Sequence, residues 1–154
     1  MAADLSAVPP PPASALQIDR ATTPEQLRAF AEVNAANWVP PDPHVVRFYE
    51  LATPLRLAAD CPLWLYVGRV GGEAVAAAGL VVGGGVAGVY AVSTRAAHRR
   101  RGYGTAMMAR LLADARAAGL PAAVLQASAD GVGLYARVGF RPVGQFTEYK
   151  PRVG

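Results

Sequence analysis

The sequence predicts an α/β (α+β) domain with a single mixed, mostly antiparallel sheet of about seven strands flanked by about four helices. The chain has 154 residues, the length of one domain. Hydrophobic residues make up 53% of the chain and charged residues 17%, so it can bury a core and wholesale disorder is excluded. Segments that alternate apolar and polar residues are interspersed with segments of helical periodicity, which indicates a sheet with helices packed on it.

Strands are expected where short apolar or alternating runs stand between turn residues. Gly71-Gly72 and Gly83 to Gly85 separate three consecutive runs, which predicts an antiparallel meander. The two last strands are expected to form a hairpin that closes the sheet. The expected strands are 16–21, 62–70, 74–82, 86–94, 122–127, 141–143 and 145–150.

Helices are expected where apolar residues recur at helical spacing between start and stop signals. Thr23 followed by Pro24 predicts the first helix start, because threonine caps helices and proline suits the first helical position. Pro54 interrupts the second region, so two short pieces are expected there. Gly119 followed by Pro121 ends the third helix. The expected helical regions are 24–33, 44–60, 103–119 and 129–138.

The first fifteen residues are mostly Ala and Pro, which predicts a disordered tail over 1–15 ahead of a domain over 16–154. Asp4 and the prolines exclude a secretory signal, which needs a basic start and an unbroken apolar run. No apolar run reaches the ~18 residues needed to cross a membrane. The protein is therefore expected in the cytoplasm, without a membrane partner.

The cysteine and histidine content argues against metal chemistry. Cys61 is the single cysteine, so an internal disulfide and a thiolate metal cluster are both excluded. His44 and His98 have no second ligand at metal spacing and are expected on the surface or in loops. No metal site is predicted.

The basic charge is concentrated ahead of a glycine-rich helix start. The net charge is +4, and four of the fifteen Lys and Arg residues fall between Arg95 and Arg101. Gly102 and Gly104 remove side chains that would block a close approach, and the unpaired N–H groups and dipole of a helix N-terminus attract anions. This segment predicts a phosphate or pyrophosphate site. The P-loop and dinucleotide fingerprints do not fit it.

The segment Arg99-Arg100-Arg101-Gly102-Tyr103-Gly104 resembles the [Arg/Gln]-x-x-Gly-x-[Gly/Ala] pattern of the GNAT superfamily of acyl-CoA N-acyltransferases. It follows a strand ending Val92-Ser93-Thr94 and opens an amphipathic helix. Tyr135, four residues before Gly139-Phe140, is similar to the family's second signature. The resemblance covers roughly 16–150 in element order. It implies a GNAT-type sheet and an N-acetyltransferase that moves an acetyl group from acetyl-CoA, its co-substrate, to a primary amine of a small molecule or peptide. It also implies direct transfer in a ternary complex.

The resemblance further implies the roles of individual residues. Tyr135 matches the position that protonates the leaving thiolate and is the expected catalytic residue. The strand backbone would bind the pantetheine arm, the loop and helix start would cradle the pyrophosphate, and the later loop would lie near the thiol. The implied cofactor-binding residues are Val92, Ser93, Thr94, Arg99, Arg100, Arg101, Gly102, Tyr103, Gly104, Thr105, Ser128 and Gly133.

The sequence does not identify the general base or the acceptor substrate. Many relatives carry a glutamate on the fourth strand, whereas Val86 to Val92 has no carboxylate, which leaves ordered water, Glu50, Asp60 or Glu148. The acceptor pocket is expected to come from the first two helices and the last hairpin. The candidates are Asn37, Trp38, His44, Phe48, Tyr49, Gln145 and Tyr149.

Two other functions compete with this one. A non-catalytic acyl-CoA-binding module would share the site but lack turnover, and the missing glutamate keeps it open. A nucleic-acid-binding domain would need a broad basic face or stacking aromatics beside the arginines, and only Tyr103 is near. No nucleic-acid partner is therefore expected, and a homodimer is left open.

Overall fold

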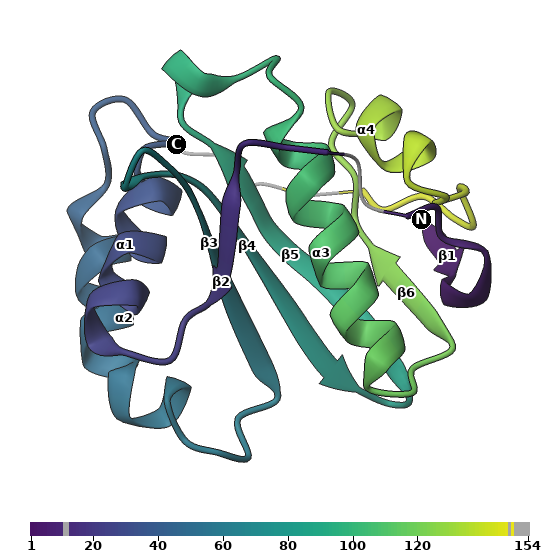
Figure 1. Cartoon of the computed structure of the whole chain (residues 1–154), viewed down its shortest axis with the longest axis horizontal. Helices are drawn as coiled ribbons and strands as arrows, with labels where there is room; N and C mark the ends of the chain where they lie inside the picture. Colours follow the sequence, from purple (N-terminus) through teal and green to yellow (C-terminus); the bar gives the residue numbers. More distant parts are fainter. Residues whose placement is uncertain (11–12, 148, 150–154) are drawn as a thin grey trace.

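The meander predicted from the glycine turns forms the centre of the sheet. The computed structural model describes residues 1–10, 13–147 and 149. Its six-stranded sheet has the order β1-β6-β5-β4-β3-β2 (Figure 1). The β5–β6 pair is parallel and the other pairs are antiparallel. The strands are β1 (Ala2–Asp4), β2 (Gln17–Arg20), β3 (Leu63–Val70), β4 (Glu73–Gly83), β5 (Val86–Thr94) and β6 (Ala122–Leu125).

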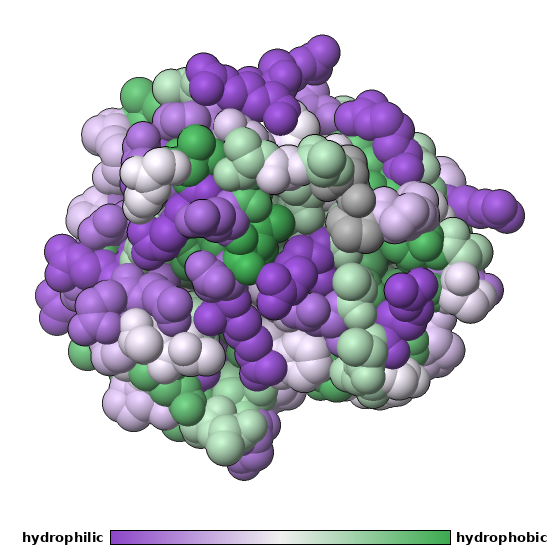
Figure 2. Space-filling model, in the orientation of Figure 1, coloured by the Kyte–Doolittle hydropathy of each residue, from purple (hydrophilic) through white to green (hydrophobic). Residues whose placement is uncertain are grey.

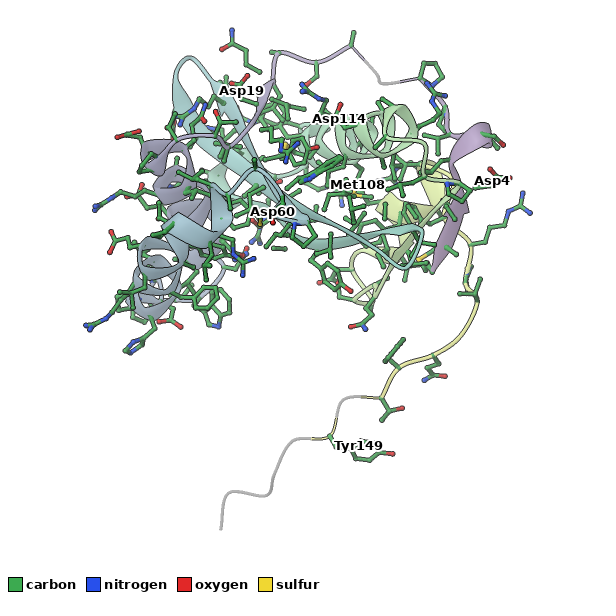
Figure 3. The ribbon with its side chains drawn as sticks, turned by 90° about the horizontal axis from the view of Figure 1, so that it is seen from below. Asp4, Asp19, Asp60, Met108, Asp114 and Tyr149 are labelled. Atoms are coloured by element: carbon green, nitrogen blue, oxygen red, sulfur yellow. The ribbon has the colours of Figure 1, made fainter. Side chains whose placement is uncertain are left out.

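Four α-helices cover this sheet on its two faces. Helix α3 lies on one face and the α1–α2 pair on the other, as the view from below shows (Figure 3). The helices are α1 (Pro24–Ala35), α2 (Pro43–Arg56), α3 (Tyr103–Ala117) and α4 (Val132–Arg137), with two 3₁₀ turns, η1 (Leu5–Ala7) and η2 (Ala96–His98). The predicted fold class is therefore confirmed, with six strands in place of about seven.

Each face of the sheet has its own core. The apolar side of α3, including Met107 and Leu111, packs against a cluster that contains Tyr66 of β3. On the other face, Phe30 of α1 packs with Leu65 of β3. These are the faces that the helical spacing predicted, and they fix both helix layers on the sheet.

The prediction of two helical pieces around Pro54 is wrong. Helix α2 is continuous from Pro43 to Arg56, and Pro54 lies in its last turn. A proline removes one N–H and crowds the carbonyl four residues earlier. Because Pro54 lies so close to the end of α2, no further helical turn follows it that could form a second piece.

The prediction of a disordered tail is wrong for the first residues. Strand β1 pairs with β6, with Ala3 opposite Ala123, and the side chain of Leu5 is 1% exposed. The N–H of Leu5 also donates to the carbonyl of Pro121 at 3.0 Å. The free edge of β6 supplies hydrogen-bond partners, and Leu5 adds apolar burial, so this segment belongs to the folded domain.

The predicted closing hairpin is also absent from the residues that the structure describes. Arg141 makes only an isolated bridge with Ala2, and 142–147 form no strand. Tyr149 lies in an extended segment that leads away from the sheet (Figure 3), while Glu148 and Lys150 lie outside the described residues. Strand β1, and not a closing hairpin, forms the edge of the described sheet beside β6. Over the described chain, no helix combines the length and apolar character needed to span a membrane.

Candidate functional site

Strand β5 pairs with β6 only over its first residues, and beyond them an opening separates β5 from the chain that follows β6. Residues 87–89 of β5 pair with residues 123–125, but β5 continues to Thr94 while β6 ends at Leu125. The N–H of Arg95 donates to the carbonyl of Val75 in β4 at 2.9 Å. Because successive residues of a strand turn their backbone groups to opposite sides, Val92 and Thr94 direct theirs toward the opening. The carbonyl of Thr94 accepts a hydrogen bond from Nε of Arg99 at 3.1 Å.

A bulge sets the direction of β5 at this opening. The register with β4 shifts between Ala77 and Gly79, and Ala91 has a φ of 51°. Two residues of β5, Ala91 and Val92, therefore lie opposite a single residue of β4, Ala78. Bulges bend a strand and increase its twist, so this one re-aims the last residues of β5 at the opening.

A cavity of about 830 Å³ occupies the opening. It extends from the end of β5 past the start of α3 to the loop before α4. Tyr135 and every residue predicted to bind the cofactor, except Arg101, border it. Its lining residues are Asn37, Val92, Ser93, Thr94, His98, Arg99, Arg100, Gly102, Tyr103, Gly104, Thr105, Ser128, Asp130, Gly131, Gly133, Leu134, Tyr135 and Arg137.

Arg101 borders a second cavity, of about 390 Å³. Residues 13–15 line its other side, and Gly102, Tyr103 and Thr105 border both cavities. Residues 13–15, which precede β2, thus lie beside the start of α3 (Figure 1). In the space-filling view, hydrophilic side chains gather over the loop between β5 and α3 (Figure 2).

Helix α3 begins without a side-chain cap in the described structure. Gly102 is the N-cap residue with a φ of 80°, and Arg100 two residues earlier has a φ of 62°. Both lie in the left-handed region, which glycine adopts without strain and arginine does not. The first-turn N–H groups, together with the helix dipole, are available to an anion.

Close packing joins the start of α3 to α4. A Cβ placed on Gly104 would lie 2.7 Å from Cδ1 of Leu134. A larger residue at 104 would therefore push against the helix that carries Tyr135. This contact links the anion-binding end of the cavity to its other end.

The spacing between Tyr135 and Gly139-Phe140 has a structural cause. The N–H of Phe140 donates to the carbonyl of Tyr135 at 3.0 Å, and that of Gly139 donates to the carbonyl of Ala136 at 3.2 Å. With φ of 95° at Gly139, these are the two bonds of a Schellman motif that ends α4. The rings of Tyr135 and Phe140 meet edge to face, 6.1 Å apart, which fixes the tyrosine. Burial raises the pKa of Tyr135, so its hydroxyl keeps its proton at neutral pH.

Two buried polar atoms at the cavity have no hydrogen-bond partner among the described residues: the hydroxyl oxygen of Ser93 and Nδ1 of His98. His98 lies in η2, largely buried, with Nε2 3.8 Å from a carboxylate oxygen of Glu73. It was expected on the surface or in a loop, and only the fold reveals its place in the lining. Asp130 also lines the cavity; it lies in the loop from Ser128 to Gly133 that was expected near the thiol, but its carboxylate was not singled out.

Of the residues predicted for the acceptor pocket, Asn37 alone borders either described cavity. Trp38 and Phe48 are half exposed, and the ring of Tyr49 packs against Phe30 at 5.0 Å. His44 stands at the start of α2 and Gln145 in the segment after Arg141, both exposed. Trp38, His44, Phe48, Tyr49 and Gln145 therefore do not line either described cavity.

The predicted general bases lie elsewhere. Glu50 accepts a hydrogen bond from Arg28 at 3.2 Å on the surface, and Asp60 borders neither described cavity. Glu148 lies outside the described residues. Within the described part of the chain, no group of three or more His, Cys, Asp or Glu side chains could hold a metal ion.

Residues 13–131 match the family described as "Acetyltransferase (GNAT) domain". No curated protein matches the sequence. A GCN5-related N-acetyltransferase from Ralstonia eutropha JMP134 has a similar structure, with a TM-score of 0.67 and 25% identity over 90% of this chain and 99% of that one.

Two further structures share the fold. A predicted acetyltransferase with acetyl-CoA from Clostridium acetobutylicum superposes with a TM-score of 0.69 and 15% identity over 88% of this chain and 96% of its own. AAC(6')-Iy in complex with the bisubstrate analog CoA-S-monomethyl-acetylneamine gives a TM-score of 0.69 and 17% identity over 90% of this chain and 99% of its own.

Proposed function

Because the chain belongs to the GNAT acetyltransferase family, we propose that it moves an acetyl group from acetyl-CoA to a primary amine of a small molecule or peptide. The transfer is direct, in a ternary complex, with no acyl group bound to the enzyme. The observation that carries the proposal is the cavity between the diverging strands, which joins the helix N-terminus that follows the arginine cluster to the partly buried Tyr135. We also propose that the protein resides in the cytoplasm and that its acetyltransferase domain, predicted over 16–154, includes β1 as well.

The lining suits a long ligand with anionic groups at one end. Backbone groups of Val92 and Thr94 face the opening and would hold the pantetheine arm as a neighbouring strand would. The N–H groups at the start of α3 would hold the pyrophosphate. Arg99 and Arg100 would add positive charge there, and Arg101, which borders the second cavity, would bind a further phosphate of the nucleotide.

Tyr135 is the proposed general acid. Acetyl-CoA supplies a thioester, and its sulfur must leave with a proton when the C–S bond breaks. Burial raises the pKa of the phenol, so Tyr135 enters the reaction protonated. A general acid within hydrogen-bond reach of the leaving atom contributes roughly 10²–10⁴ in rate. The phenolate then regains its proton from water.

The amine nitrogen forms the new C–N bond and loses one proton. Glu50 is engaged with Arg28, and Asp60 lies outside the cavity lining, so neither is placed to take it. Water in the cavity is the proposed acceptor, with Asp130 as the carboxylate on the described lining. Departure of this proton balances the one that Tyr135 gives to sulfur.

A thermal-shift scan with acetyl-CoA, CoA and longer acyl-CoAs tests the co-substrate site. A ligand at 100 times its dissociation constant adds about 2.7 kcal/mol to the stability. No shift with any CoA species would overturn the proposal. Thiol release with a panel of primary amines tests catalysis, and CoA binding without any thiol release would instead favour the non-catalytic module.

A further inference from the structure

The backbone of Ser93 cannot take part in the cavity as its neighbours do. Ser93 pairs with Ala77 of β4, so its N–H and carbonyl point to that strand and away from the opening. Cross-strand partners share a sheet face, and Ala77 packs into the cluster around α1. The side chain of Ser93 therefore lies on the α1 face, opposite α3.

The hydroxyl of Ser93 lacks a partner in the described structure. The residue is 6% exposed, borders the cavity, and its Oγ makes no hydrogen bond to any described group. Buried hydroxyls nearly always have a partner, and Ala77, the residue opposite Ser93 in β4, has no side-chain group that could supply one. Because Ser93 borders the cavity, a molecule bound there can supply that partner.

Asn37 borders the same cavity from the α1 face. It stands in the connection between α1 and α2, whereas Tyr103 and Gly104 border the cavity from the opposite face at the start of α3. The cavity therefore passes through the opening of the sheet. The side-chain amide of Asn37 donates to Oδ1 of Asn34 over a long 3.4 Å and is otherwise available to a ligand.

We propose that Ser93 is the residue that positions the acceptor amine, with its Oγ accepting a hydrogen bond from the attacking nitrogen. The inference rests on the proposed acetyl transfer. The acceptor would enter from the α1 face past Asn37, while the nucleotide lies on the α3 face. Both groups are uncharged, so they suit a primary amine with a hydroxyl or carbonyl that can bond to the Asn37 amide.

The geometry also fits the proton balance of the reaction. As the nitrogen lone pair forms the C–N bond and the C–S bond breaks, the N–H becomes more acidic and its bond to Oγ strengthens. Tyr135 supplies the proton that sulfur takes, and the excess nitrogen proton passes to water. Ser93 keeps its own proton throughout.

A tethered amine tests this placement without knowledge of the natural acceptor. In a Cys61→Ser background the chain has no other thiol, so Ser93→Cys can be labelled with 2-aminoethyl methanethiosulfonate, which attaches an aminoethyl group through a disulfide. We expect acetyl-CoA to transfer one acetyl group to this amine, seen by intact mass spectrometry. Adding Tyr135→Phe should slow that transfer.

Ser6→Cys in the same background is the matched control. Ser6 is an exposed hydroxyl next to Leu5, whose backbone bonds to Pro121 beyond the far end of α3, and its aminoethyl group should stay unmodified. Failure of the reagent to label the Ser93→Cys protein, or equal acetylation of both labelled proteins, would overturn the placement. So would a labelled Ser93→Cys protein that gives an acetyl-CoA thermal shift but gains no acetyl group. If acetyl-CoA gives no thermal shift with the unmutated chain, the proposed function itself is contradicted.

Ser93→Ala gives a second measurement. Removing one hydrogen bond to the acceptor should raise KM for a reactive amine roughly 3- to 10-fold, while the acetyl-CoA dissociation constant measured by calorimetry stays the same. A KM unchanged for the amine, or weakened acetyl-CoA binding of the same size, would show that the hydroxyl does not contact the acceptor.

Discussion

Replacing Gly102 by alanine should reduce both stability and acetyl-CoA affinity. Gly102 has a φ of 80°, and a Cβ there would meet no atom within 4 Å. The change in stability is therefore backbone strain alone, about 1–2 kcal/mol for a left-handed residue, partly offset by the lower chain entropy of alanine. A net loss of about 1 kcal/mol lowers Tm by roughly 2–4 °C in a domain of this size.

The ligand effect follows from the position of the open space. Gly102 borders both cavities, so a Cβ would occupy room beside the proposed pyrophosphate site. Losing one hydrogen bond to a charged group weakens binding about tenfold or more. At an acetyl-CoA concentration of 100 times the unmutated dissociation constant, the stabilisation would fall from about 2.7 to about 1.4 kcal/mol. Differential scanning fluorimetry with and without acetyl-CoA measures both quantities.

Gly119→Ala is the matched control for this experiment. Gly119 follows the other end of α3 and has a φ of 79°, and a Cβ there would likewise meet no atom within 4 Å. The substitution should lower Tm by the same amount and keep the full acetyl-CoA shift. If both variants lose the same part of the shift, or if Gly102→Ala loses none, the start of α3 does not hold the anion.

Three further outcomes are expected. Tyr135→Phe should lower kcat by roughly 10²-fold or more with little change in acetyl-CoA affinity; because burial raises the pKa of Tyr135, unmutated activity should fall as the pH rises through that raised value, and the variant's pH–rate profile should lack this limb. Leu5→Ala should destabilise the domain by about 2–5 kcal/mol in denaturant unfolding, since Leu5 is buried, whereas a disordered tail would show no change. Tyr66→Phe should cost about 1 kcal/mol, because its hydroxyl donates to Asp114 at 2.9 Å, and an unchanged midpoint would show that this bond adds nothing.

The features predicted correctly from sequence are held together by neighbours along the chain. Thr23 caps α1 as predicted, with its Oγ accepting from the N–H of Gln26 at 3.3 Å. Gly119 ends helix α3 through bonds only a few residues long. Such bonds join residues three to five positions apart, so the sequence pattern predicts them.

The wrong predictions concern contacts between distant segments. Strand β1 pairs with β6, more than a hundred residues away in the chain, and no pattern within either segment indicates that pairing. Pro54 was predicted to break α2 because proline disrupts helices, but a proline in the last turn of a helix leaves the helix continuous. In both cases the outcome depends on where a pairing strand or the end of a helix lies, and the local sequence pattern does not determine that position.

By itself, the sequence determined the fold class, the helix ends and the arginine- and glycine-rich start of α3, because these follow from local hydrogen bonding and periodicity. Only the tertiary structure decided which side chains share the cavity. It brought His98 to the lining, left Asn37 there alone of the predicted acceptor residues, placed Arg101 at the second cavity, and turned the hydroxyl of Ser93 to the face opposite α3. The physical reason is that strand register and the divergence of β5 from β6 set those directions, and both arise from pairing between residues far apart in the chain.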